Sequence, residues 1–274
     1  MTQGLSTRTT VPATARVVTL PDGAQLFVRV DEGDPEAPPV VFLHGNRDNH
    51  THFAELATML SGERRCASVD LRGHGLSSKE DVPLSAQQCA DDLVTVLDEL
   101  GWESAVLVGH SLGSVTAMVF ALDHPDRVNS LVLMGSAAHY EMKWQRPPVT
   151  EETYRDVIAQ SNERAGPFFF LPHHPEVAAR VIASWSWVPF SVHKNLIQLQ
   201  HPDLRERIGG ITARTLVIAA DQDRSTPVSS AELLVERIPD AQLHVVSDAG
   251  HFMFLEHPVE VATTIRDFLS HPTE

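Results

Sequence analysis

Apolar runs of strand length alternate along the chain with segments whose apolar residues recur at helical spacing, as in residues 86–100. The apolar runs lie in residues 37–46, 66–69, 104–109, 129–134, 215–219 and 242–246. Strand and helix signals that alternate in this way predict an α/β fold with a largely parallel sheet. A chain of 274 residues is long enough for one such domain with an insertion.

Ser111 stands between two glycines, in the sequence Gly-His-Ser-Leu-Gly of residues 109–113. The run at 104–109 predicts a strand before it, and a helical pattern follows over residues 112–122. A strand, a sharp turn and a helix in this order expose a serine hydroxyl for attack. Glycine suits both flanking positions because the serine backbone is strained and a side chain there would collide with the strand or the helix. The motif predicts a nucleophile; the alternative is a glycine-rich turn whose serine caps a helix.

Polar residues follow three other predicted strands. The run at 37–46 ends in His-Gly-Asn, and backbone N–H groups of that loop are expected to face Ser111 at the carboxyl edge of the sheet. Asp223 follows the run at 215–219 and precedes Pro227 by four residues, while His251 follows the run at 242–246. The chain therefore carries a serine, an aspartate and a histidine in that order, each after a strand.

Other polar residues near strand ends are expected to be structural. Asp70 and Arg72 lie in a glycine-containing turn after the run at 66–69 and are expected to brace loops. The same expectation holds for most of the fifteen histidines. It applies to His110 beside Ser111, to His44 and His74 in turns, and to the adjacent pair His173 and His174.

With these four motifs in this order, the sequence resembles the α/β-hydrolase superfamily, specifically its small, cofactor-independent serine enzymes of the esterase, lactonase and haloperoxidase-like group. The resemblance covers almost the whole chain. It implies a mostly parallel eight-stranded sheet flanked by helices, with a helical lid insertion. It also implies that Ser111 is the nucleophile, Asp223 the acid and His251 the base, and that the backbone N–H groups of Asn46 and Leu112 form the oxyanion hole.

The sequence departs from the family pattern at two places. The acid loop begins with Ala220 where the family commonly has glycine, and it offers Asp221 beside Asp223; the spacing to Pro227 favours Asp223. The segment after His-Gly, residues 46–50, is unusually polar.

The chemistry requires these residue types. A serine hydroxyl is a poor nucleophile at neutral pH, so a base must take its proton, and histidine can both accept and return it. A carboxylate orients the imidazole and stabilises its protonated form. Preorganised N–H donors stabilise the oxyanion that develops on the substrate carbonyl.

The alternation of strands and helices breaks between residues 138 and 209, which divides the chain into a first core part at 1–137, a lid at 138–209 and a second core part at 210–274. More than half of the aromatic residues fall in the insertion. We expect them to form a mostly apolar substrate pocket above the sheet edge; the alternative is that they only attach the lid to the core. The candidate pocket residues are His110, Trp144, Phe168, Trp185, Trp187 and Phe252.

Composition narrows the class of protein further. A formal net charge of −15 argues against binding to nucleic-acid phosphates. No apolar run approaches the length that spans a membrane, and residues 1–10 lack the apolar core of a signal peptide, so a cytoplasmic location is expected. Cys66 and Cys89 are expected to be reduced core thiols. No metal or other cofactor is expected, because no metal-binding spacing occurs.

The function predicted from these features is hydrolysis of a small or medium apolar carboxylic ester, lactone or thioester through an acyl-enzyme. The substrate is a small molecule. Two alternatives share the same triad, a carbon–carbon bond hydrolase and a cofactor-free haloperoxidase or perhydrolase. An alternative of another class is a receptor-like protein that binds a ligand on the same fold and turns it over slowly or not at all.

Overall fold

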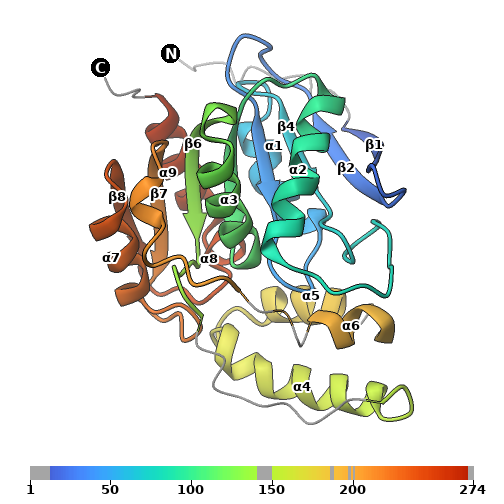
Figure 1. Ribbon diagram of the computed structural model, residues 1–274. Coiled ribbons are helices and arrows are strands. Elements are labelled where there is room, and N and C mark those ends of the chain that lie inside the picture. Colours follow the sequence, from blue (N-terminus) through green and yellow to red (C-terminus); the bar gives the residue numbers. More distant parts are fainter. Residues whose placement is uncertain (1–12, 141–149, 186–187, 197–198, 200, 271–274) are drawn as a thin grey trace, which may run out of the picture.

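Eight strands form one sheet within the part of the chain that the structure, a computed structural model, describes: residues 13–140, 150–185, 188–196, 199 and 201–270. They are β1 (Thr14–Thr19), β2 (Gln25–Asp31), β3 (Val40–Leu43), β4 (Cys66–Val69), β5 (Ala105–His110), β6 (Val128–Met134), β7 (Arg214–Ala220) and β8 (Ala241–Val246). Their order is β1-β2-β4-β3-β5-β6-β7-β8. The pairs β1–β2 and β2–β4 are antiparallel and the other five pairs are parallel, which confirms the mostly parallel eight-stranded sheet (Figure 1).

Helices cover both faces of the sheet (Figure 1). One face carries α2 (Ala86–Leu100), α3 (Leu112–Asp123) and α7 (Val228–Arg237), and the other carries α1 (Ala54–Leu60), α8 (Met253–Glu256) and α9 (Pro258–Ser270). Short 3₁₀ turns occur at His50–Phe53, Pro125–Arg127 and Ile208–Gly210. The strands β3 and β5 are buried on both sides, which is why they are continuous apolar runs in the sequence.

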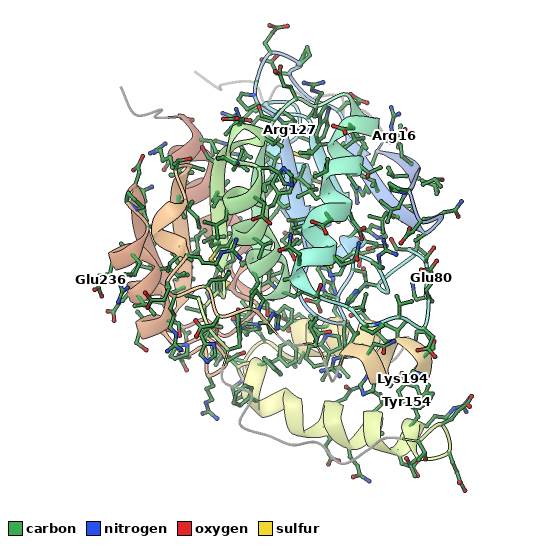
Figure 2. The ribbon with its side chains drawn as sticks, in the orientation of Figure 1. Arg16, Glu80, Arg127, Tyr154, Lys194 and Glu236 are labelled. Carbon is green, nitrogen blue, oxygen red and sulfur yellow. The ribbon has the colours of Figure 1, made fainter. Side chains whose placement is uncertain are left out.

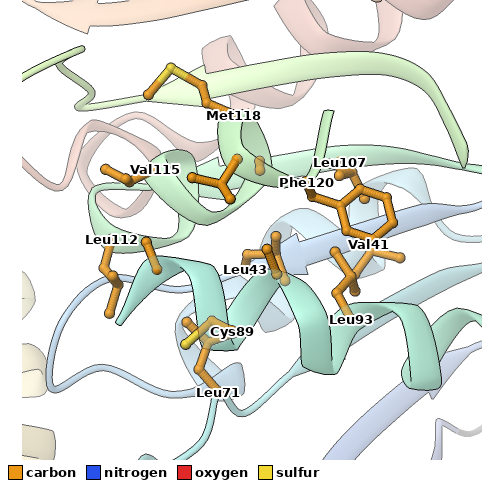
Figure 3. Close-up of a cluster of buried hydrophobic side chains, with 14 of the residues drawn as sticks. Val41, Leu43, Leu71, Cys89, Leu93, Leu107, Leu112, Val115, Met118 and Phe120 are labelled. Atoms are coloured by element: carbon orange, nitrogen blue, oxygen red, sulfur yellow. The ribbon is translucent and has the colours of Figure 1, made fainter. Parts of the chain in front are cut away.

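Alternate side chains of each central strand enter different hydrophobic clusters. Leu107 of β5 packs in the cluster beneath α2 and α3, together with Leu93 and Phe120 (Figure 3), whereas Val106 and Val108 point to the opposite cluster beneath α1 and α9. Such alternation follows from the two-residue repeat of a strand. The two clusters fix the strands in register and so bring their carboxyl ends to one edge of the sheet.

Helix α2 shows how local sequence sets an element's ends. The Ser85 hydroxyl accepts a hydrogen bond of 3.0 Å from the Gln88 N–H at the N-terminus, and Gly101 adopts a left-handed conformation at the C-terminus, with φ 68°. The helix therefore spans the predicted residues. Cys89 on this helix and Cys66 on β4 are both buried and unpaired by a disulfide, as expected.

Within the described part of the interval between β6 and β7, three α-helices lie beneath the carboxyl ends of the strands (Figure 1). They are α4 (Tyr154–Phe169), α5 (Pro175–Trp185) and α6 (Phe190–Leu196), called here the helical insertion. Trp185 and Phe170 pack in the cluster beneath α1 and α9, so the insertion shares a core with the sheet. The predicted domain boundaries at residues 138 and 209 stay predictions. Among the described residues, no helix combines the length and apolar character needed to cross a membrane.

Candidate active site

Ser111 occupies the turn between β5 and α3 with a strained backbone, at φ 51° and ψ −113°. The two flanking glycines make this turn possible. A Cβ at Gly113 would overlap the Leu43 carbonyl oxygen of β3, and one at Gly109 would overlap the backbone of Gly113. The Ser111 N–H donates to the Met134 carbonyl oxygen at 3.0 Å, which ties the turn to β6. Close approach of strand and helix therefore explains both glycines of the motif.

Asp223 and His251 form a buried pair. His251 Nδ1 donates to Asp223 Oδ2 at 2.7 Å, and both residues are about 95% buried or more. The same carboxylate accepts from Thr226 Oγ1 at 2.6 Å and from the N–H of Ser225 at 2.7 Å. Asp221 is exposed and accepts from the Ala249 N–H instead. The structure thus places Asp223, and not Asp221, against the imidazole, with its orientation set by its own loop.

The pair shifts the pKa of each partner. Burial acts to lower the pKa of His251, but the charge and hydrogen bond of Asp223 outweigh it and raise that pKa above its ordinary value. Burial acts to raise the pKa of Asp223, but the same interaction holds it below its ordinary value. A protonated imidazole is therefore stabilised at this position, as a base that takes a proton during reaction requires.

His251 lies against the turn that carries Ser111. His110 Nε2 donates to the His251 carbonyl oxygen at 2.9 Å, and the two rings are 4.7 Å apart. Gly135 directly follows β6, has φ 52° and lies close to the His251 ring. A Cβ at this position would come within 3.1 Å of His251 Cε1. His110, which the sequence predicted both as a structural histidine and as a candidate pocket residue, is thus buried and fastens the loop of His251 to the turn of Ser111.

The two predicted oxyanion donors lie on neighbouring elements. Leu112 is the first residue of α3, so its N–H has no intrahelical acceptor. Asn46 follows β3, the strand between β4 and β5 in the sheet. The direction of both N–H groups toward a substrate carbonyl stays a prediction. The side-chain oxygen of Asn46 is buried without a hydrogen-bond partner.

The polar segment after Asn46 attaches the helical insertion to the core. Asp48 is 2% exposed and accepts from the Trp185 Nε1–H of α5 at 2.9 Å. The Arg47 guanidinium lies 4.2 Å from the centre of the Trp185 ring. Burial acts to raise the pKa of Asp48, but His52 and His110 lower it well below its ordinary range. The unusual polarity of residues 46–50 thus has a structural use.

The structure separates the predicted pocket residues into different environments. Trp185 and Phe252 are both about 2% exposed and pack in the cluster beneath α1 and α9. Phe168 is 45% exposed. Its neighbour Phe169, which the sequence analysis did not single out as a pocket residue, has its ring 5.3 Å from that of His251 and accepts from the His251 N–H at 3.2 Å. Trp144 and Trp187 lie outside the described residues, and the assignment of pocket residues stays a prediction.

The residues expected to brace loops do so. Arg72 makes two hydrogen bonds to Asp92, at 2.8 and 3.0 Å, and Asp70 accepts from the His50 N–H at 2.6 Å. His44 accepts from the Leu71 N–H at 3.0 Å, so its other nitrogen donates to the Gly45 carbonyl oxygen. These bonds fix the loops that follow β3 and β4.

Two polar residues beside Ser111 were missed in the sequence analysis. Ser136 and Tyr140 follow the carboxyl end of β6, and the Tyr140 hydroxyl faces the side chains of Ser111 and Ser136. Burial, and then the Asp223 carboxylate, raise the pKa of Tyr140, so its hydroxyl stays protonated. The available signal was their position after a central strand. No three His, Cys, Asp or Glu side chains are grouped to hold a metal ion in the part of the chain that the structure describes.

Comparison with known proteins identifies the family of the chain. The sequence model of the alpha/beta hydrolase family matches residues 40–264, and the chain belongs to that family. It is 28% identical to 3-oxoadipate enol-lactonase 1 of Acinetobacter baylyi over 248 residues, which cover 88% of this chain and 92% of the relative. It is 30% identical to a 2-hydroxymuconate semialdehyde hydrolase of a Pseudomonas species over 255 residues, covering 85% and 87%. The solved structure of Est816, described as an N-acyl homoserine lactone degrading enzyme, superposes with a TM-score of 0.80 at 30% identity, covering 92% of this chain and all of that one.

Proposed function

We propose that this hydrolase cleaves a carboxylic ester, lactone or thioester through an acyl-enzyme on Ser111. The observation that carries the proposal is the 2.7 Å hydrogen bond between His251 and Asp223, fastened by His110 to the strained turn of Ser111. His251 and Asp223 are paired beside the turn that carries Ser111, and this is the arrangement that nucleophilic catalysis by a serine requires.

In the proposed reaction, Ser111 Oγ attacks the substrate carbonyl carbon while His251 Nε2 takes the hydroxyl proton. Asp223 accepts a hydrogen bond from His251 Nδ1–H and stabilises the imidazolium that forms. The N–H groups of Asn46 and Leu112 donate to the oxyanion. The imidazolium then gives its proton to the leaving group, and a water molecule, activated by the same histidine, hydrolyses the acyl-enzyme.

The proposed substrate is small or medium in size, with an apolar part that meets the aromatic side chains of the insertion. Phe169 and Trp185 bring the insertion close to His251, which supports a role for α4, α5 and α6 as a lid that excludes water. The names of two relatives, an enol-lactonase and an N-acyl homoserine lactone degrading enzyme, favour lactones among the ester substrates.

Carbon–carbon bond hydrolysis is the second candidate function. The relative named 2-hydroxymuconate semialdehyde hydrolase favours a wider substrate range than esters. The triad is the same, so a substrate screen must include dienone acids beside esters, thioesters and lactones.

Labelling with a fluorophosphonate probe tests the proposal, because such probes react with activated serines. Intact-mass measurement should show one adduct on the native protein and none on Ser111→Ala or His251→Ala. Absence of labelling on folded native protein would contradict an activated Ser111.

Multiple turnover separates an enzyme from a receptor-like binding protein. The native protein should release many equivalents of product from a good ester, lactone or thioester. Release that stops after about one equivalent would identify a ligand-binding protein on the same fold.

A further inference from the structure

Two hydroxyl groups beside the nucleophile are buried and lack hydrogen-bond partners. Ser136 is 3% exposed and its Oγ makes no hydrogen bond; the Tyr140 hydroxyl oxygen is likewise buried and unpaired. A buried hydroxyl without a partner costs about 1–3 kcal/mol. Two of them at one place leave hydrogen-bonding capacity for a polar ligand atom that reaches them.

The Tyr140 hydroxyl is positioned against the reacting atoms. It faces the Ser111 side chain, the Ser136 side chain and the Ala137 backbone. A hydrogen bond of 2.8 Å from the Leu204 N–H to the Ala138 carbonyl oxygen holds the segment in place. A ligand group that binds the Tyr140 hydroxyl therefore lies close to the carbonyl that Ser111 attacks in the proposed reaction.

A third side chain, that of His201, lies beside Tyr140 and is also uncharged. The His201 ring lies 4.6 Å from that of Tyr140, and its Nδ1 is buried without a partner. Burial lowers the pKa of His201 to about 4, so the imidazole is uncharged at neutral pH.

The charges near the cluster favour a neutral ligand group. The Asp223 carboxylate acts on the Tyr140 hydroxyl and raises its pKa, so the phenol remains a donor. The same negative charge disfavours a carboxylate in that place. A neutral donor beside an anion is suited to an ether, hydroxyl or ring oxygen.

We propose that Ser136 and Tyr140 form a specificity-determining subsite that hydrogen-bonds a neutral oxygen on the carbon beside the scissile carbonyl. The subsite rests on the proposed function and narrows it: the substrate class becomes esters or lactones with an oxygen on the carbon beside the carbonyl. The aromatic side chains of the insertion then meet the rest of the substrate. We define the polar subsite as these two residues.

The test compares two p-nitrophenyl esters of equal chain length, the methoxyacetate and the butanoate, which differ by an ether oxygen in place of a methylene group. The readout is the ratio of their kcat/KM values, so a general loss of activity cancels. Tyr140→Phe should lower this ratio about three- to tenfold relative to the native protein, the range expected for one neutral hydrogen bond. Ser136→Ala should lower it in the same direction.

Tyr154→Phe is the matched control, because the chain has only two tyrosines. Tyr154 lies on α4 (Figure 2), where its hydroxyl donates to the Val188 carbonyl oxygen. This variant should leave the ratio of the two esters unchanged. An unchanged ratio in folded Tyr140→Phe, or equal changes in both tyrosine variants, would overturn the subsite. If Tyr140→Phe does not fold, the Ser136→Ala ratio decides.

A binding measurement separates failure of the subsite from failure of the proposed function. If the native protein hydrolyses neither ester and takes no fluorophosphonate, the acyl-enzyme proposal fails. The subsite is then tested by calorimetry on Ser111→Ala with the p-nitroanilides of methoxyacetic and butanoic acids. In that background, Tyr140→Phe should weaken the binding of the methoxyacetic acid p-nitroanilide about three- to tenfold more than the binding of the butanoic acid p-nitroanilide. Equal weakening would contradict the subsite.

Discussion

The turn that carries Ser111 and the helical insertion are held in place by different means. Around Ser111 the constraint is backbone geometry: glycines at 109, 113 and 135 allow strand, helix and histidine to approach within contact distance. The insertion instead contacts the core through side chains, such as Trp185 with Asp48, and Lys194 of α6 with Asp81 at 2.6 Å. Ser111 and His251 therefore lie on closely packed backbone, whereas the helical insertion depends on contacts that substitution can weaken one at a time.

The largest effect on activity is expected for a change at Asp223, which orients His251 beside the turn of Ser111. Asp223→Asn keeps the shape of the acid loop but removes the charge that orients His251, and kcat/KM should fall about 10⁴-fold, as known for the corresponding change in a serine protease triad. Steady-state hydrolysis of an active ester measures this. Asp221→Asn is the control and should change the rate by less than about threefold, since Asp221 is exposed. Equal losses in the two variants would contradict the assignment of Asp223.

Gly135→Ala tests whether backbone approach controls the histidine. Its Cβ would come within 3.1 Å of the His251 ring at φ 52°, so kcat should fall about 10- to 100-fold as the imidazole is displaced. Gly101→Ala is the matched control, because φ there is 68° but nothing lies within 4 Å of its Cβ. Both variants should lose about 1–2 kcal/mol of stability from the left-handed backbone, measured by urea unfolding. Native activity in folded Gly135→Ala would refute the close contact.

Trp185→Phe weakens the insertion. It removes the hydrogen bond to the buried Asp48 carboxylate, so the free energy of unfolding should fall by about 1–3 kcal/mol more than in Trp102→Phe. Trp102 is a buried tryptophan of the other hydrophobic cluster and reports the cost of the smaller ring. Urea unfolding of both variants gives the difference. If the two variants lose equal stability, the Trp185–Asp48 contact does not stabilise the fold.

The smallest effect concerns pH. Because Asp223 raises the pKa of His251, the fraction of neutral base falls as pH drops through a value above the reference of about 6.5. The acid limb of kcat/KM should therefore lie above pH 6.5 in the native protein and move lower in Asp223→Asn. A pH–rate profile of both proteins measures it. A native acid limb at or below pH 6.5 would show that burial lowers the pKa of His251 by more than the Asp223 carboxylate raises it.

Much of the core was predictable because strand and helix signals there are local. The apolar runs became β3 to β8 within a residue or two, except that the run at 37–46 forms a strand only over Val40–Leu43. The glycines on either side of Ser111 stand where a Cβ would overlap neighbouring backbone, and so their spacing identifies the turn from the sequence. The preference for Asp223 over Asp221 rested on the spacing to Pro227, and the structure places Asp223 against His251.

The surroundings of the site were less predictable because they depend on which face a side chain turns to. Three successive phenylalanines gave no indication that Phe169 would touch His251 while Phe168 faced solvent. The polar residues Asp48 and Tyr140 carry no local signal for what they meet in the fold. Trp185 donates a hydrogen bond to Asp48, and Ser111 lies beside the Tyr140 hydroxyl.

The sequence by itself determined the alternation of strands and helices, the strained serine turn and the order of serine, aspartate and histidine, because each depends on near neighbours along the chain. Only the tertiary structure decided the strand order, the contact between Phe169 and His251, the attachment of the insertion through Asp48, and the position of the Tyr140 hydroxyl beside Ser111 and Ser136. The physical reason is that burial and hydrogen-bond pairing between distant segments depend on how the two hydrophobic clusters pack, which no local pattern specifies.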